Sequence, residues 1–371
     1  MDNYNFISEL FNKINEENKN ITPANIMLIG KTGVGKSTLI NNIFRENLAE
    51  TGIGKPVTQH LKKISKEGIP INLYDSKGLE LDPSVQNKVR DDINAEIDRI
   101  HKSRDINSEN LIHVIWYCIN ATSNRIEDFE IEWIKELSEK VPVIVVLTQS
   151  FSDNSKELEK YIDNMNLNIK GIQRILAEPI KFGNIELPRF GLQELVEKTY
   201  QVLPQGIRRA FNNAQKVDLK RKVDEATRWA LGYIGTSFGV GFTPIPFSDS
   251  AILIPGQVGM LAHITSIFGV KVDKDLLVAI ASGVGGIAGA TIAGKTLVAN
   301  LIKLIPGAGT LIGGAISGAT ASTLTTALAF SYIEVMKRVA ANQYEGKVAK
   351  NEEISEMMYN ELKKYFKHSN R

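Results

Sequence analysis

Hydrophobic positions in the first half of the chain fall into short continuous runs separated by amphipathic stretches. The apolar runs at residues 24–30, 111–121 and 141–149 contain few polar positions, a pattern typical of strands buried on both faces of a mostly parallel sheet. Residues 61–75 predict two more strands joined by a turn. Helical spacing of apolar positions follows in three stretches: 84–103, 126–140 and 155–170. This alternation of strands and helices predicts an α/β domain over residues 25–203.

The N-terminal segment, residues 1–24, predicts a short amphipathic helix. Its apolar side chains recur at helical spacing: Phe6, Ile7, Leu10, Phe11 and Ile14. Two interpretations stay open. The apolar face packs on its own protein, or it contacts a membrane or a partner.

After about residue 200 the pattern changes, and an all-α domain is expected over residues 204–371. It begins with a charged connector helix at residues 205–228 and ends with a charged C-terminal helix at residues 336–371. Between them, residues 229–335 predict apolar helices rich in Gly, Ala, Ile and Thr. Four windows there contain no charged residue: 229–248, 250–270, 276–294 and 304–333.

The apolar windows allow two interpretations. Each is about as long as a membrane-spanning helix, and Gly-x3-Gly pairs such as Gly285 and Gly289 permit close helix contacts. However, Pro255 and Pro306 interrupt the windows, and Gly, Ser and Thr dilute their hydrophobicity. A packed soluble bundle and a membrane-inserting or lipid-binding hairpin therefore both stay open, with a membrane or protein partner for residues 229–335.

Bulk composition narrows the partners and the compartment. The formal net charge of the 371 residues is only +2, which does not favour DNA as a partner. Cys118 is the only cysteine and lies in an apolar run, so it predicts a core residue and a reducing compartment. The N-terminus lacks the basic and apolar regions of a signal peptide. A cytoplasmic protein is expected, with peripheral membrane association left open.

The segment GKTGVGKS, at residues 30–37, matches the phosphate-binding pattern G-x-x-x-x-G-K-[ST] in full. It follows a predicted strand and opens a predicted helix, which is the context this motif requires. Backbone N–H groups of the loop and the helix N-terminus favour a phosphate anion. Lys36 is expected to bridge the β- and γ-phosphates, and Ser37 to ligate magnesium. The candidate nucleotide-binding residues here are Gly30, Lys31, Thr32, Gly33, Val34, Gly35, Lys36, Ser37 and Thr38.

Two further elements suit a nucleotide switch. Asp75 ends a predicted strand and starts the sequence DSKG, so it is a candidate magnesium ligand through water, and the Gly78 N–H is a candidate sensor of the γ-phosphate. Thr58, in GIGKPVTQ, is the preferred switch threonine for magnesium, and Thr51 is the competing choice.

These motifs resemble a family. GKTGVGKSTLINNIF, the threonine of PVTQ and the strand-borne DSKG are similar to a small Ras-type G domain of the Era and translation-factor class. LAEPIKFGNIELPRFGLQELVEKTYQVLP and GFTPIPFSDSAILIPGQVGMLAHITSIFGV resemble bacterial GTPases with a YcjF-like helical domain. The resemblance covers most of residues 25–335. It implies a P-loop NTPase fold, GTP or GDP and Mg²⁺ as ligands, and GTP hydrolysis.

The resemblance also implies a base-reading loop, and here the sequence departs from the family. Thr148 and Gln149 occupy that loop, and Ala177 the last nucleotide loop, but Phe151 stands where the family has the guanine-reading aspartate. Asp153 reaches the base only if the loop is longer by two residues. Guanine and adenine therefore remain alternatives.

The water-positioning glutamine of many such enzymes is replaced by Leu79, so slow intrinsic hydrolysis is expected. Lys36, Thr58 and Gly78 are the candidate catalytic residues. A dimer partner that docks through the G domain, an activator or the switch loop would complete the site, with Lys55 or Lys77 as candidate cations.

Three functions remain at this point. The first is a GTP-hydrolysing switch that controls the helical domain. The second is a nucleotide-binding structural or membrane-associated module with negligible turnover. The third is a P-loop ATPase of relaxed base specificity.

Overall fold

The chain folds into two compact units. The computed structural model describes residues 6–76, 83–102, 110–238, 250–285 and 318–368. The sheet unit comprises Ile21–Asp218, and the helical unit combines Met1–Asn20 with Leu219–Arg371. The N-terminal helix therefore joins the helical unit, and the boundary expected at residues 203–204 lies instead at residues 218–219.

The sheet unit is built on a mostly parallel sheet. Among the described residues its strands run in the order β2-β3-β4-β1-β5-β6-β7. The strands are β1 (Ala24–Ile29), β2 (Ile53–Pro56), β3 (Leu61–Lys66), β4 (Ile69–Ser76), β5 (Val114–Asn120), β6 (Val143–Thr148) and β7 (Ile172–Arg174). Within the described sheet, the only antiparallel pairs are β2 with β3 and β3 with β4. The carboxyl ends of β1, β4, β5 and β6 therefore meet at one edge.

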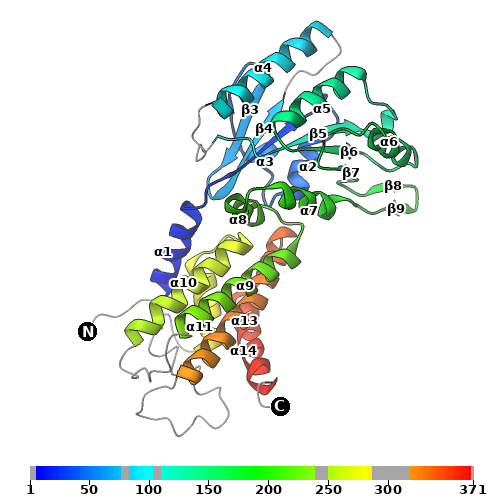
Figure 1. Cartoon of the computed structure of the whole chain (residues 1–371). Coiled ribbons are helices and arrows are strands. Elements are labelled where there is room, and N and C mark those ends of the chain that lie inside the picture. The colour runs from blue at the N-terminus through cyan, green and yellow to red at the C-terminus, as the bar shows by residue number, and fades with distance from the viewer. Residues whose placement is uncertain (1–5, 77–82, 103–109, 239–249, 286–317, 369–371) are drawn as a thin grey trace. The chain divides into compact units, whose positions relative to one another are not determined.

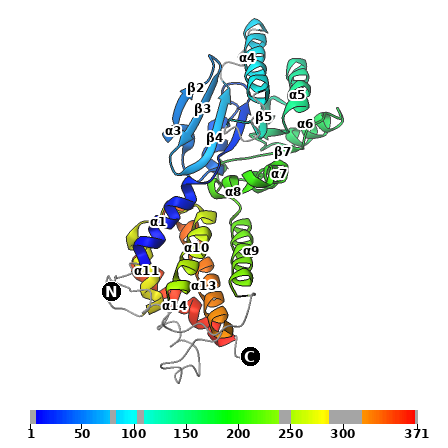
Figure 2. The ribbon, with the colours of Figure 1, turned by 60° about the vertical axis from the view of Figure 1, so that its left-hand side comes forward.

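Helices cover both faces of this sheet (Figures 1 and 2). One face is covered by α4 (Pro83–Lys102), α5 (Asp128–Lys140) and α6 (Asn154–Asp163). The other is covered by α2 (Lys36–Ile43), α3 (Leu48–Thr51), α7 (Leu192–Val202) and α8 (Gln205–Ala214). Both faces are covered because the central strands β1, β5 and β6 are apolar on both sides. The predicted α/β fold is confirmed.

The predicted connector helix over residues 205–228 is wrong in one respect. The structure has two helices there, α8 and α9 (Leu219–Phe238), separated by a turn. In that turn, the buried Gln215 side chain donates to the Asp218 carbonyl (3.1 Å) and accepts from the Asp218 N–H (2.8 Å). Phe211 is buried against the sheet, so α8 belongs to the sheet unit rather than to the helical one.

A buried polar network joins β1, β4 and the residue just before β5. His113 Nδ1 accepts from the Asn25 N–H (2.9 Å), and the Asn25 side chain accepts from Asn72 (2.8 Å). Burial lowers the pKa of His113 to about 4 from 6.5, because a charged ring would lose its hydration there. The ring is therefore neutral at pH 7 and serves as a hydrogen-bond acceptor.

His113 is expected to make the sheet unit sensitive to acid. As pH falls below about 6.5 the unfolded chain takes up the proton first, so the free energy of unfolding falls until the folded ring also titrates near pH 4. The full loss is about 3 kcal/mol. Denaturation between pH 7 and pH 4, followed by the fluorescence of the buried Trp116 and Trp133, measures it. His113→Asn keeps an acceptor near the Nδ1 position, so it should flatten this slope. An unchanged slope would contradict the assignment.

The helical unit has its own apolar core. Its described helices are α1 (Phe6–Lys19), α9, α10 (Ser250–Phe268), α11 (Lys274–Gly285), α13 (Gly318–Tyr344) and α14 (Asn351–His368). The apolar face of α1 is buried in this core, and His263 Nδ1 lies 3.2 Å from a Glu17 carboxylate oxygen, joining α10 to α1. The prediction that the N-terminal helix packs on its own protein is confirmed.

The expected division of the helical domain at residue 336 is also wrong. Helix α13 continues to Tyr344, because Met336, Val339 and Ala340 are buried in the same core. Parts of the predicted apolar windows, residues 239–249 and 286–317, lie outside the described residues. In the part of the chain that is described, no helix has both the length and the hydropathy needed to cross a membrane.

A buried lysine stabilises the end of α10. Lys222 of α9 is fully buried, and its Nζ donates to the carbonyls of Ile267 (3.3 Å) and Phe268 (2.9 Å). These are carbonyls of the last helical turn, which have no partner within the helix. The Tyr344 hydroxyl donates to the Phe268 carbonyl as well (2.5 Å), so α9, α10 and α13 meet at this point.

Candidate functional site

The glycine-rich loop joins β1 to α2 at the carboxyl edge of the sheet. Gly30 has a φ of 153°, and a Cβ there would lie 2.4 Å from the Cys118 carbonyl of β5. Only glycine lets the loop leave β1 so close to its neighbour. Gly33 and Gly35 have φ values of 78° and 95°, in the left-handed region that glycine adopts readily. The predicted loop conformation thus has a steric cause at each of these glycines.

The second lysine of this loop, Lys36, lies inside it. Lys36 Nζ donates to the carbonyls of Gly30 (2.7 Å) and Lys31 (3.2 Å). Helix α2 begins at Lys36, and Ser37 is exposed in its first turn with Thr38 beside it. Thr32 and Gly33 are exposed at the tip of the loop, whereas Val34 is buried beneath it. This arrangement places an ammonium group and a helix N-terminus at one point, which suits a phosphate.

Cys118 packs under the loop as a core residue. It is fully buried, and burial raises the pKa of its thiol to about 12. The thiol is therefore protonated and unreactive at neutral pH, as expected for a structural cysteine.

Asp75 lies beside the loop on the neighbouring strand. It pairs in register with Leu28 of β1, so its backbone is next to the strand that feeds the loop. Thr58 lies between β2 and β3, where its hydroxyl accepts from the His60 N–H (3.2 Å). Thr51, the competing switch residue, ends α3 instead. Gly78, Lys77 and Leu79 lie outside the described residues.

A second loop, after β6, is bonded directly to the glycine-rich loop. The buried Thr148 hydroxyl lies 2.5 Å from the Val34 carbonyl and 3.1 Å from the Ile119 carbonyl. Gln149, in a left-handed conformation with φ 53°, donates its side-chain amide to the Gly33 carbonyl (3.4 Å). The two loops are therefore neighbours through the side chains of Thr148 and Gln149.

The same loop reaches the segment that contains Ala177. The Ser150 N–H donates to the Ile175 carbonyl (3.0 Å), two residues before the half-buried Ala177. Asp153 does not face inward with them. Its side chain is 90% exposed and pairs with Lys156 (2.8 Å), which lowers the pKa of the Asp153 carboxyl through that hydrogen bond and charge.

Sequence reasoning missed a short hairpin beside this loop. Strands β8 (Ile180–Phe182) and β9 (Ile185–Leu187) pair in antiparallel fashion, with Phe182 opposite Ile185. The rings of Phe182 and Phe151 lie 6.2 Å apart between centroids. The turn at Gly183, with a φ of 61°, was the signal available in the sequence FGN.

A salt bridge flanks the glycine-rich loop on its other side. Lys31 Nζ lies 2.5 Å from a Glu127 carboxylate oxygen at the start of α5. The Glu127 N–H in turn donates to Glu130 (3.0 Å), and burial raises the pKa of that second carboxyl. The Lys31 side chain is thus paired with a carboxylate at the start of α5.

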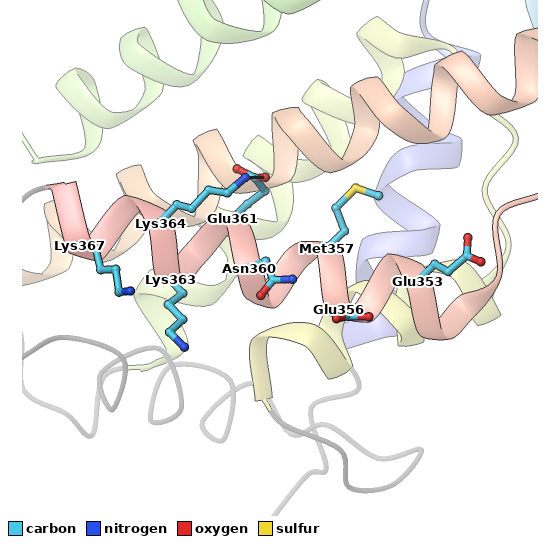
Figure 3. Close-up of a pocket in the computed structure, with 8 residues that line it drawn as sticks. All are labelled: Glu353, Glu356, Met357, Asn360, Glu361, Lys363, Lys364 and Lys367. Atoms are coloured by element: carbon cyan, nitrogen blue, oxygen red, sulfur yellow. Dashed lines mark hydrogen bonds and ion pairs between the residues drawn. The ribbon is translucent and has the colours of Figure 1, made fainter.

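A hollow of about 530 Å³ lies along α14 in the helical unit (Figure 3). Its described lining comes from α14 alone, with Glu353 and Glu356 toward the start of the helix and Lys363 and Lys367 toward its end. Acidic residues near a helix N-terminus and basic residues near its C-terminus complement the helix dipole. The helix dipole therefore accounts for the order of these charges. The described lining of the hollow includes none of the nucleotide-binding motifs.

Known proteins resemble the sheet unit. Residues 25–149 match the family model described as 50S ribosome-binding GTPase, which covers about a third of the chain. The match supports a small GTPase G domain in the sheet unit. It includes the glycine-rich loop, Thr58 and Asp75, and it ends at Gln149, before Phe151 and Asp153.

Individual relatives are distant and match in part. Septin-14 of Mus musculus is 26% identical over 170 residues, which cover 40% of this chain and 39% of that protein. Translocase of chloroplast 108 of Physcomitrium patens is 35% identical over 80 residues, or 21% of this chain and 8% of that protein. The chain thus spans less than two-fifths of the length of either relative.

A solved structure, the crystal structure of a probable GTP-binding protein engB, matches at 18% identity with a TM-score of 0.31. It covers 50% of this chain and 99% of that one.

Proposed function

We propose that this protein is a GTP-binding and GTP-hydrolysing switch whose nucleotide state controls the helical unit. The observation that carries the proposal is the arrangement around the glycine-rich loop. Lys36 lies inside the loop, Asp75 lies on the adjacent strand, and the Thr148 hydroxyl is hydrogen-bonded to the loop from the end of β6. The family match over residues 25–149 supports guanine nucleotide as the ligand. The finer resemblance, to bacterial Era-like GTPases with a YcjF-like helical domain, belongs to the same proposal.

The residues around the loop fit a magnesium ion. Ser37 is exposed at the first turn of α2. Asp75 lies on β4, and Thr58 lies between β2 and β3. Hydroxyl and carboxylate oxygens are the ligands that Mg²⁺ prefers. When bound, the ion would neutralise charge on the phosphates. In this proposal Ser37, Thr58 and Asp75 hold it, directly or through water.

Hydrolysis is expected to be slow. Leu79 cannot orient a water molecule by hydrogen bonding, so the groups proposed to act on the γ-phosphate are Lys36, Thr58 and the Gly78 N–H. A further cation from Lys55, Lys77 or a second copy docked through the G domain would raise the rate.

Contacts inside the sheet unit support coupling to the helical unit. The far end of α2 is bonded to the segment just before residue 219: the Lys216 Nζ donates to the Asn41 carbonyl (2.7 Å) and its N–H to the Ile43 carbonyl (2.9 Å). The Arg45 N–H donates to the Ala214 carbonyl (3.0 Å). The helix whose N-terminus faces the proposed phosphates thus holds, at its other end, the chain that leads into α9.

One observation favours a second candidate. Phe151 replaces the carboxylate that would distinguish guanine from adenine, which favours an NTPase of relaxed base specificity.

A nucleotide-binding module with negligible turnover predicts nucleotide retained on the purified protein without phosphate release.

Titration of the full chain with GTP, GDP and ATP in the presence of magnesium tests the proposal. GTP and GDP should bind and phosphate release from GTP should be measurable. Asp153→Ala should leave the affinities unchanged within about twofold, because an exposed side chain held by Lys156 contributes little. If Asp153→Ala erases a preference for guanine, Asp153 reads the base after all. If no nucleotide binds, the proposed function is wrong.

A further inference from the structure

Phe151 occupies a defined place relative to the proposed phosphate site. It lies two residues after Gln149, which is bonded to Gly33, and one after Ser150, which is bonded to Ile175. The loop that carries Phe151 is therefore attached on one side to the glycine-rich loop and on the other to the segment containing Ala177. In a nucleotide bound with its phosphates at Lys36, the base would lie along this loop.

The Phe151 ring is paired with a second exposed ring. Phe182, on the β8–β9 hairpin, lies 6.2 Å from Phe151 between centroids, with a 55° angle between the ring planes. Phe151 is 37% exposed and Phe182 56% exposed, although each could gain free energy from burial. Neither ring belongs to the buried cores of the sheet unit. Both aromatic side chains therefore remain partly open to solvent beside the proposed base site.

The described side chains of this loop offer no inward carboxylate for guanine. Phe151 replaces it, and Asp153 is turned to Lys156. An aromatic ring recognises a purine by stacking on its π face, and every base presents such a face. Stacking thus adds affinity with little discrimination between guanine and adenine.

We propose that Phe151 and Phe182 form an aromatic shelf that stacks against the purine base of the bound nucleotide, in place of recognition by a carboxylate. The inference rests on the proposed nucleotide-binding function and names its base subsite. It assigns the β8–β9 hairpin a role in binding, and it explains how the chain holds a purine without the family's aspartate.

Calorimetric titration of the full chain with GDP, ADP and pyrophosphate, each with magnesium, tests the shelf. Phe182→Ala should weaken GDP and ADP alike, by about tenfold each. Its affinity for pyrophosphate, which has no base, should not change. The matched control is Ile185→Ala, which removes an equally apolar and more exposed side chain from the opposite strand of the same hairpin. It should alter none of the three affinities by more than about twofold.

A direct signal comes from Phe182→Trp. Stacking on a purine should quench the added indole fluorescence with GDP and ADP, and pyrophosphate should leave it unchanged.

Four results would overturn the shelf. They are unchanged GDP affinity in Phe182→Ala, an equal loss of pyrophosphate affinity, an equal effect of Ile185→Ala, and no base-dependent quenching in Phe182→Trp. The unaltered chain separates the two proposals. If it binds none of the three ligands, the proposed function itself fails, and the shelf fails with it. If it binds them and only the variants disagree, the shelf alone is wrong.

Discussion

Replacing Lys36 by alanine is expected to weaken GTP binding by about two orders of magnitude, or ~3 kcal/mol, and to remove measurable hydrolysis. Its ammonium group lies inside the glycine-rich loop, bonded to the carbonyls of Gly30 and Lys31. A phosphate bound there would lose its one described side-chain cation within the loop, because the other lysine of the loop, Lys31, is held by Glu127. Calorimetry and single-turnover phosphate release would measure both effects.

The control for this prediction is Lys140→Ala. Lys140 belongs to the same unit but pairs with Asp98 (2.8 Å) at the end of α5, away from the loop. Affinity for GTP should stay within about twofold, since a surface ion pair of this kind contributes little even to stability. Wild-type hydrolysis in Lys36→Ala would show that the loop is not the phosphate site. Thermal unfolding of both variants distinguishes lost binding from lost folding.

Gly283→Ala is expected to destabilise the helical unit by about 1–3 kcal/mol. Gly283 lies where α11 crosses α14, and an added Cβ would be 2.2 Å from the Ser355 carbonyl oxygen and 2.8 Å from the Met358 Cβ. The first of these contacts is with backbone, so one helix has to move away from the other. Urea denaturation followed by helical circular dichroism measures the change.

Gly235→Ala provides a control of opposite sign. It also lies in a helix of the helical unit, α9, but among the described residues no atom outside its own stretch of helix lies within 4 Å of the position its Cβ would take. Alanine there should stabilise the helix by about 0.5–1 kcal/mol, because glycine loses more backbone entropy on folding. If both variants shift stability in the same direction, close packing at Gly283 is not the cause.

Most of the sheet unit could be predicted because its signals are local. Continuous apolar runs correctly indicated β1, β5 and β6, and the turn after Lys66 correctly separated β3 from β4. The short strands β2 and β7 escaped prediction, since a few residues without an apolar run carry no periodic signal. The break between α8 and α9 escaped as well, because Gln215 ends a helix through side-chain bonds to its own turn.

The candidate site divides in the same way. The proposed phosphate-binding residues could be predicted from the spacing of the glycines and one lysine. The residues proposed to contact the base could not, because that contact depends on where side chains point. The sequence left Asp153 as a candidate base reader, whereas the fold turns it toward Lys156. Phe182 lies far along the chain from Phe151 and carries no motif, so only the folded chain, in which the β8–β9 hairpin contacts the loop after β6, brings the rings together.

The sequence by itself determined the α/β class, the conformation of the glycine-rich loop and the strand that carries Asp75, because these depend on residues that are neighbours along the chain. Only the tertiary structure decided that α1 packs in the helical unit, that α8 packs on the sheet, and that α2 is bonded to the chain leading into α9. Such contacts join residues that are distant in sequence. Their free energy comes from burial and hydrogen bonds that form only once the separate elements have met.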